Sequence, residues 1–156
     1  MTKIQFSVKG IPPIKSSNQS IWSLDAQSER LAKLRLEALR EKKKQELTQV
    51  FNTRLSLEFE IFAPLKDLNT IGDLDNMIGG VSDGLQAKPN NPNLITHDIF
   101  LKPEMQDISP EKPILYNDDS QIWMIFASKT EIEKEIYYTV KINELDNNSN
   151  RFERVS

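Results

Sequence analysis

The sequence predicts a small α/β domain with a mixed (α+β) sheet, whose elements follow the order βαβαββ. Two kinds of periodicity carry this prediction. Short segments alternate apolar and polar residues, which is typical of half-buried strands, while two longer segments repeat apolar residues at helical spacing. The length of 156 residues suits a single domain that is large enough to bury a core.

The first half of the chain predicts a strand, a helix and a second strand. Apolar and polar residues alternate over residues 4–8, before a turn at Gly10. Helical spacing then extends over residues 25–49, and Asp25 is a suitable N-cap for this helix. Residues 54–62 alternate most regularly of all, so we expect a strand with one buried face.

The second half predicts one helix and two strands. The helix covers residues 73–86, after a turn over residues 66–72. Residues 121–127 are almost continuously apolar, so we expect a strand that is covered on both faces, with Trp123 in the core. A final strand covers residues 136–142.

These elements define one folded unit over residues 1–142. Residues 88–113 are rich in Asn, Pro and Lys and form a long loop insertion, which is the kind of loop that is usually functional or mobile. The Asn-rich tail over residues 143–156 is expected to be flexible.

Composition narrows the chemistry that is available. The chain has no cysteine, which excludes disulfides, thiolate nucleophiles and cysteine-ligated zinc. Its single histidine, His97, lies in a predicted loop, so multi-histidine metal sites are excluded and a catalytic His97 is disfavoured. The net charge of −3 does not by itself indicate a nucleic-acid partner. The sequence has neither a secretory signal nor a membrane-spanning run, so we expect a cytoplasmic protein.

Carboxylates are therefore the main candidates for functional groups, and three of them are placed to share a metal ion. Leu74 and three apolar residues that follow it lie within a stripe roughly 60° wide on the second helix, at about 100° per residue, and Asp75 lies on the flank of this stripe. Asp73 can act together with Asp75 only from the N-cap, because helix positions i and i+2 diverge by about 200° at that spacing. Asp119 comes directly before the apolar strand, with Asp118 beside it.

This set of oxygen ligands suits Mg²⁺ or Mn²⁺, completed by waters and a phosphate. Each of the two parts of this ligand set, on the second helix and before the apolar strand, has a simpler interpretation. Asp73 taken alone fits an ordinary helix cap, and the pair Asp118 and Asp119 fits an ordinary turn. The prediction therefore depends on both halves lying together in the fold.

The motifs resemble a known family. Residues 72–76 read Gly-Asp-Leu-Asp-Asn, residues 81–85 read Val-Ser-Asp-Gly-Leu, and residues 117–122 read Asn-Asp-Asp-Ser-Gln-Ile. In this order they resemble the RusA-type Holliday junction resolvases, and residues 10–15 resemble the first strand and turn of that family.

The resemblance implies a homodimeric, Mg²⁺-dependent (or Mn²⁺-dependent) endodeoxyribonuclease that resolves four-way DNA junctions by paired nicks, in DNA recombination and repair. Carried over by position, Asp73, Asp75 and Asp119 would be the catalytic, metal-binding residues, supported by Asn76 and Asp118.

Two features depart from the family pattern. The family carries a lysine one helical turn after the second aspartate, where this chain has Gly79, and the 88–113 insertion is longer than the usual family link. Lys15, Lys88 or Lys129 could supply the missing cation, but the sequence spacing does not select one of them. The alternative is a degenerate member that binds branched DNA or a protein partner without cutting it.

Basic side chains are the candidates for contacts with DNA phosphates. The predicted set is Lys15 together with Lys42, Lys43 and Lys44 at the end of the first helix, although this helix face could equally be solvated and balanced by its glutamates. Trp22 could stack on an unpaired base, but an anchor in the core or an interface is the simpler interpretation.

Overall fold

The computed structural model describes residues 2–16, 20–23 and 25–145 and has a four-stranded mixed sheet with strand order β1-β4-β2-β3. The strands are β1 (Lys3–Lys9), β2 (Leu55–Ala63), β3 (Ile122–Glu131) and β4 (Tyr137–Glu144). β4 runs antiparallel to both β1 and β2, whereas β2 and β3 run parallel. The predicted mixed α+β class in a single domain is confirmed.

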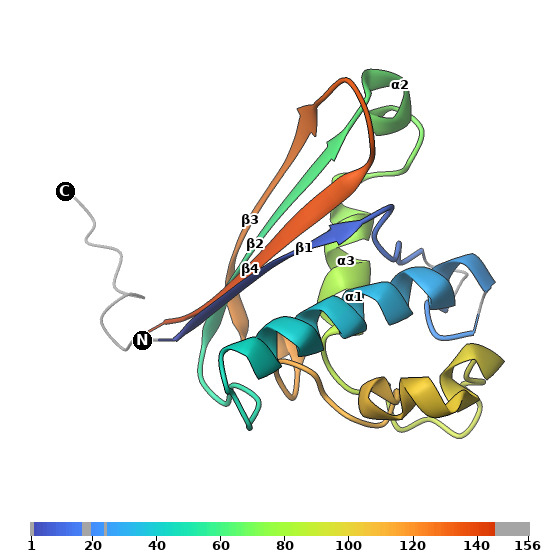
Figure 1. Cartoon of the computed structure of the whole chain (residues 1–156), viewed down its shortest axis with the longest axis vertical. Coiled ribbons are helices and arrows are strands. Elements are labelled where there is room, and N and C mark those ends of the chain that lie inside the picture. Colours follow the sequence, from blue (N-terminus) through green and yellow to red (C-terminus); the bar gives the residue numbers. More distant parts are fainter. Residues whose placement is uncertain (1, 17–19, 24, 146–156) are drawn as a thin grey trace.

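Two helices cover one face of this sheet (Figure 1). α1 (Asp25–Lys44) packs on β1, and α3 (Leu74–Gly84) contacts both α1 and β3. A short α2 (Leu65–Leu68) links β2 to α3 at one end of the sheet. In the described parts of the chain, none of the helices is long and apolar enough to cross a membrane.

α1 ends earlier than the spacing predicts. Glu46 has a φ of 58°, and the backbone N–H of Leu47 donates back to the carbonyl of Lys42 over 2.9 Å. This left-handed residue and its return hydrogen bond are typical of a helix C-cap, which satisfies the last carbonyls and stops the helix. The predicted extension to residue 49 was therefore wrong.

β3 lies at the edge of the sheet, which corrects the prediction of a strand covered on both faces. Its side chains at Trp123, Ile125 and Phe126 are 59, 50 and 56% exposed. Trp123 was predicted to be in the core and is instead exposed, with the guanidinium carbon of Arg54 lying 4.9 Å from its ring centroid. An apolar run indicates a strand, but it does not reveal that the strand pairs with β2 on one side only.

β4 continues past the predicted end at residue 142. Lys3 pairs with Asn143, and the N–H of Glu144 donates to the carbonyl of Thr2. The first residues of the predicted tail are thus part of the sheet. The rest of that prediction, from residue 146 onward, lies outside the described residues.

The 88–113 segment is a packed structure that contains the short 3₁₀ helices η1 (Asp98–Leu101) and η2 (Pro103–Ile108). It is held to α1 by Arg35, whose side chain is fully buried. The guanidinium donates to five backbone carbonyls: those of Ile108 (3.0 Å), Gly84 (2.7 Å), Gln86 (2.8 Å), Ser109 (2.8 Å) and Lys112. Burial lowers the pKa of this guanidinium to about 9. Arg35 therefore joins the insertion to both helices.

Replacing Arg35 with methionine is expected to lower the free energy of unfolding by about 3 kcal/mol or more, because five backbone carbonyls lose a charged donor. Urea denaturation would measure this loss. Arg40→Met is the matched control, since Arg40 is exposed and forms only a surface ion pair with Glu37. Equal effects of the two substitutions would contradict the role given to Arg35.

Candidate functional site

Asp73 lies where the sequence predicts it, at the N-cap of α3. Its backbone is extended, with φ −78° and ψ 147°, and its carboxylate makes no capping hydrogen bond. Gly72, with φ +139°, provides the turn before it. The carbonyl of Gly72 accepts a 3.0 Å hydrogen bond from the ammonium of Lys129, which ties this turn to β3. Asp75 follows in the first turn of α3.

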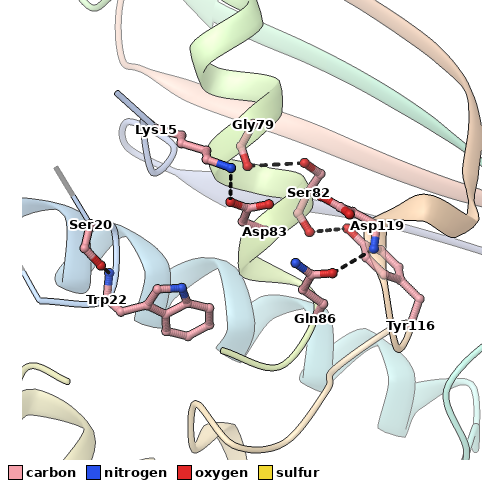
Figure 2. Close-up of polar contacts among 9 residues, drawn as sticks. All are labelled: Lys15, Ser20, Trp22, Gly79, Ser82, Asp83, Gln86, Tyr116 and Asp119. Carbon is pink, nitrogen blue, oxygen red and sulfur yellow. Dashed lines mark hydrogen bonds and ion pairs between the residues drawn. The ribbon is translucent and has the colours of Figure 1, made fainter. Parts of the chain in front are cut away.

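Asp119 lies at the other end of α3. It begins η3 (Asp119–Gln121), the short 3₁₀ helix that leads directly into β3. Its backbone N–H donates to Oε1 of Gln86 over 2.7 Å, as Figure 2 shows. Asp118 caps η3 by accepting from the N–H of Ser120 over 2.8 Å. These hydrogen bonds hold the backbone at Asp119 in place.

The partner of Asp119 on α3 is Asp83. The pKa of Asp119 is raised to about 6, first by burial and then by side-chain hydrogen bonds to Asp83 and Asp118 and by the repulsion between these carboxylates. Asp83 also forms an ion pair with the ammonium of Lys15, in which Nζ lies 2.7 Å from Oδ2. Two carboxyl groups and one ammonium group therefore meet at the side of α3 (Figure 2).

The support beneath this cluster is buried and hydrogen-bonded. The hydroxyl of Tyr116, a fully buried residue, donates to the carbonyl of Ser82 over 2.5 Å, and Oγ of Ser82 donates to the carbonyl of Gly79 over 3.2 Å. Burial raises the pKa of Tyr116 well above its ordinary value, and the charges of Asp119 and Asp83 add to this. The hydroxyl therefore stays protonated and keeps the segment before η3 against α3.

The predicted set of Asp73, Asp75 and Asp119 stays a prediction. Asp83 follows Asp75 by eight residues, which is about 12 Å along a helix that rises roughly 1.5 Å per residue. Within residues 2–16, 20–23 and 25–145, no three His, Cys, Asp or Glu side chains are grouped as metal ligands. The carboxyl groups that raise the pKa of Asp119 are those of Asp83 and Asp118.

Asp83 was not among the predicted site residues, although it lies in the motif over residues 81–85. Asp83 lies four residues after Gly79 and so returns to a similar face of α3, one turn later. That spacing was the available signal. It was outweighed by the proximity of Asp73 and Asp75 in the sequence.

The predicted basic residues separate into buried and exposed ones. Lys42 is 9% exposed and donates to the carbonyl of Ile114 over 3.0 Å, so it does not belong to an exposed DNA-binding surface. Lys43 and Lys44 are exposed, and Lys43 lies 3.5 Å from a carboxylate oxygen of Asp107. Of the four predicted residues, Lys15 alone contacts the carboxyl cluster. The backbone of Asn76 supports it, since its carbonyl accepts from the N–H of Lys15.

His97 and Trp22 have structural roles. Nε2 of His97 donates to Asp25 over 2.6 Å, while its Nδ1 accepts from the N–H of Ile99 over 3.0 Å. The side chain of Trp22 is buried, which agrees with the prediction of a core anchor rather than an exposed stacking platform.

No protein-family model matches this chain, and a comparison with curated proteins finds no match either. The interpretation of the site therefore rests on its geometry and on the motifs themselves.

The raised pKa of Asp119 predicts how stability changes with pH. The folded protein holds a proton on Asp119 up to about pH 6, whereas the ordinary value is 3.8. Because the unfolded chain binds fewer protons between these values, the stability that this proton contributes falls as pH rises through that range. Asp119→Asn removes the titration. In urea denaturation, we expect the free energy of unfolding of the wild type to fall relative to that of the variant as pH rises from 4 to 6. A difference between the two proteins that stays constant from pH 4 to 7 would contradict this prediction.

The donor set of the cluster fits a hard divalent cation. The charge of Asp83 raises the pKa of Asp119 through the repulsion between the two carboxyl groups, which a bound cation would relieve. Mg²⁺ and Mn²⁺ prefer oxygen ligands of this type and keep several waters. The two carboxyl groups are thus of the ligand type that such a cation prefers.

Proposed function

We propose that this protein is a divalent-cation-dependent endodeoxyribonuclease of the RusA type, which resolves four-way DNA junctions by paired nicks in recombination and repair in the cytoplasm. The observation that carries the proposal is the meeting of Asp83, Asp119 and Lys15 beside α3. Two carboxylates and an ammonium group are the groups required to hold a metal ion and contact a phosphate. The order of the sequence motifs supports branched DNA as the substrate.

The residues of the cluster have distinct roles in this reaction. Asp83 and Asp119 would hold Mg²⁺ or Mn²⁺, which when bound polarises a phosphate and lowers the pKa of a water molecule. Asp119 must release its proton to act as a ligand, so its raised pKa favours activity above about pH 6. Gln86 and Tyr116 keep Asp119 and its segment in place.

A homodimer is the form that suits paired cleavage. A four-way junction has two-fold symmetry, and a two-fold dimer presents two equivalent sites to opposing strands. Each protomer would contribute one cluster of Asp83, Asp119 and Lys15.

The test is the incubation of a labelled four-way junction with the protein and Mg²⁺ or Mn²⁺, beside a linear duplex of the same sequence. Symmetrical nicks that require the metal ion and occur only in the junction support the proposal. Absence of cleavage at every metal concentration and at pH 7 to 8, from a folded protein, would reject it.

The second candidate is a degenerate member of the same type, which binds branched DNA or a protein partner without cutting it. Two observations favour it. Gly79 supplies no cation, and Asp73 and Asp75 lie at the opposite end of α3 from Asp119. Tight, junction-selective binding that is unchanged by metal ions and lacks nicking would identify this candidate in the same assay.

A further inference from the structure

The segment after β1 is fixed closely against α3. A Cβ atom on Gly80 would lie 1.9 Å from the carbonyl oxygen of Pro13, so only glycine allows the two backbones to touch here. One residue further on, the N–H of Ile14 donates to Oε1 of Gln27 on α1 over 2.7 Å. The N–H of Lys15 donates to the carbonyl of Asn76 over 3.0 Å. The backbone of Ile14 and Lys15 is thus anchored to both helices.

The side chain of Lys15 crosses α3 at Gly79. A Cβ atom on Gly79 would lie 3.4 Å from both Cβ and Cδ of Lys15, so the lysine stem occupies the space above this glycine. Its ammonium then reaches Asp83, next to Asp119, as Figure 2 shows. The lysine side chain is 56% exposed, whereas that of Asp83 is only 17% exposed. The ammonium therefore lies on the solvent side of the carboxyl pair, where a substrate would approach.

We infer that Lys15 is the phosphate-binding cation of this site, supplied by the segment after β1 across Gly79 instead of by α3 itself. This inference rests on the proposed function, because it assigns a role within the same site. Without a metal ion, Lys15 pairs with Asp83. A divalent cation on Asp83 and Asp119 competes for that carboxylate, and the flexible lysine stem then turns its charge to a DNA phosphate.

This arrangement has two separate consequences. Lys15 repels a divalent cation and competes with it for Asp83, so removing its charge should leave the affinity for the metal ion equal or higher. The same removal takes one positive charge from the DNA contact, so the dependence of binding on salt should become less steep by about one unit. If Lys15 had a purely structural role, its replacement would not combine an equal or higher affinity for the metal ion with a weaker salt dependence of DNA binding.

The experiment compares Lys15→Met with Lys134→Met, an exposed lysine that serves as the matched control. Mn²⁺ affinity is measured by titration without DNA, and junction binding is measured in Ca²⁺ over a range of salt concentrations. We expect Lys15→Met to bind Mn²⁺ as tightly as the wild type or several-fold more tightly, with a reduced salt slope. Weaker Mn²⁺ binding, or an unchanged salt slope, would overturn the inference.

Cleavage provides the second readout and separates the two proposals. Lys15→Met should lower the rate of junction nicking by about a hundredfold or more, because it removes a cation from the transition state. Adding Gly79→Lys to Lys15→Met should restore much of that rate, since it returns an ammonium group to the same face of α3. A wild type that never cleaves rejects the nuclease proposal, while the Mn²⁺ and salt measurements still decide the role of Lys15.

Discussion

Asp119→Asn is expected to lower metal-dependent nicking of a four-way junction by at least about a hundredfold, a loss larger than that of a residue which only supports a ligand. The substitution keeps the size of the side chain and leaves the backbone hydrogen bond to Gln86 intact. It removes the charge that a divalent cation requires. Because the raised pKa of Asp119 marks a strained carboxyl group, the variant should fold at least as well as the wild type at neutral pH.

The matched control for this prediction is Asp118→Asn. Asp118 is the neighbouring carboxylate, but it is exposed and is used to cap η3, a role that asparagine can also fill. Nicking rates are compared under saturating Mg²⁺ with circular dichroism as a check of folding. The account is contradicted if Asp118→Asn abolishes nicking while Asp119→Asn retains it.

Gly80→Ala should strongly reduce stability, with a loss of about 2–4 kcal/mol or a failure to fold. The new Cβ would meet the carbonyl oxygen of Pro13 at 1.9 Å, and backbone on both sides leaves no flexible group to yield. The segment that carries Lys15 would have to move away from α3. Thermal denaturation of the purified protein measures this loss.

The neighbouring glycine is the internal control. Gly79→Ala places a Cβ at 3.4 Å from the stem of Lys15, which is an ordinary contact. It also gains up to about 1 kcal/mol of helix propensity, so this variant should be as stable as the wild type or slightly more stable. Equal losses from both substitutions would mean that general helix packing, and not the contact with Pro13, determines the effect.

The strands were predicted well where apolar and polar residues alternate. β1, which packs against α1, alternates exposed and buried residues, and β2 alternates buried and half-buried residues from Leu57 onward, so the alternation in the sequence matches the structure. β3 was predicted as a strand, but its predicted burial on both faces was wrong, since an apolar run is equally compatible with a central strand and with an exposed edge. The position of a strand in the sheet depends on long-range pairing, which local sequence patterns do not encode.

The site was predicted in part. The N-cap position of Asp73 followed from the divergence of i and i+2 side chains, and the structure confirms it. The contact between Asp119 and Asp83 did not follow, because it depends on where the 88–113 segment returns the chain. That return is fixed by Arg35 and five carbonyls, a buried arrangement without a local sequence signature.

The choice of Lys15 also required the fold. The sequence offered Lys15, Lys88 and Lys129 as cations without a means to select among them. In the structure Lys88 donates to the insertion itself, at Leu94 and Thr96, and Lys129 holds the turn before α3. Lys15 is the one of these three that reaches a carboxylate of the cluster.

The proposed divalent-cation site lies between Asp83 and Asp119, and titration with Mn²⁺, followed by electron paramagnetic resonance or calorimetry, tests whether the cation binds there. The account predicts that Asp83→Asn and Asp119→Asn each weaken Mn²⁺ binding by at least about tenfold. Asp75→Asn, at the far end of α3, should have a smaller effect. Loss of Mn²⁺ binding in Asp75→Asn, with Asp83→Asn unchanged, would contradict the account.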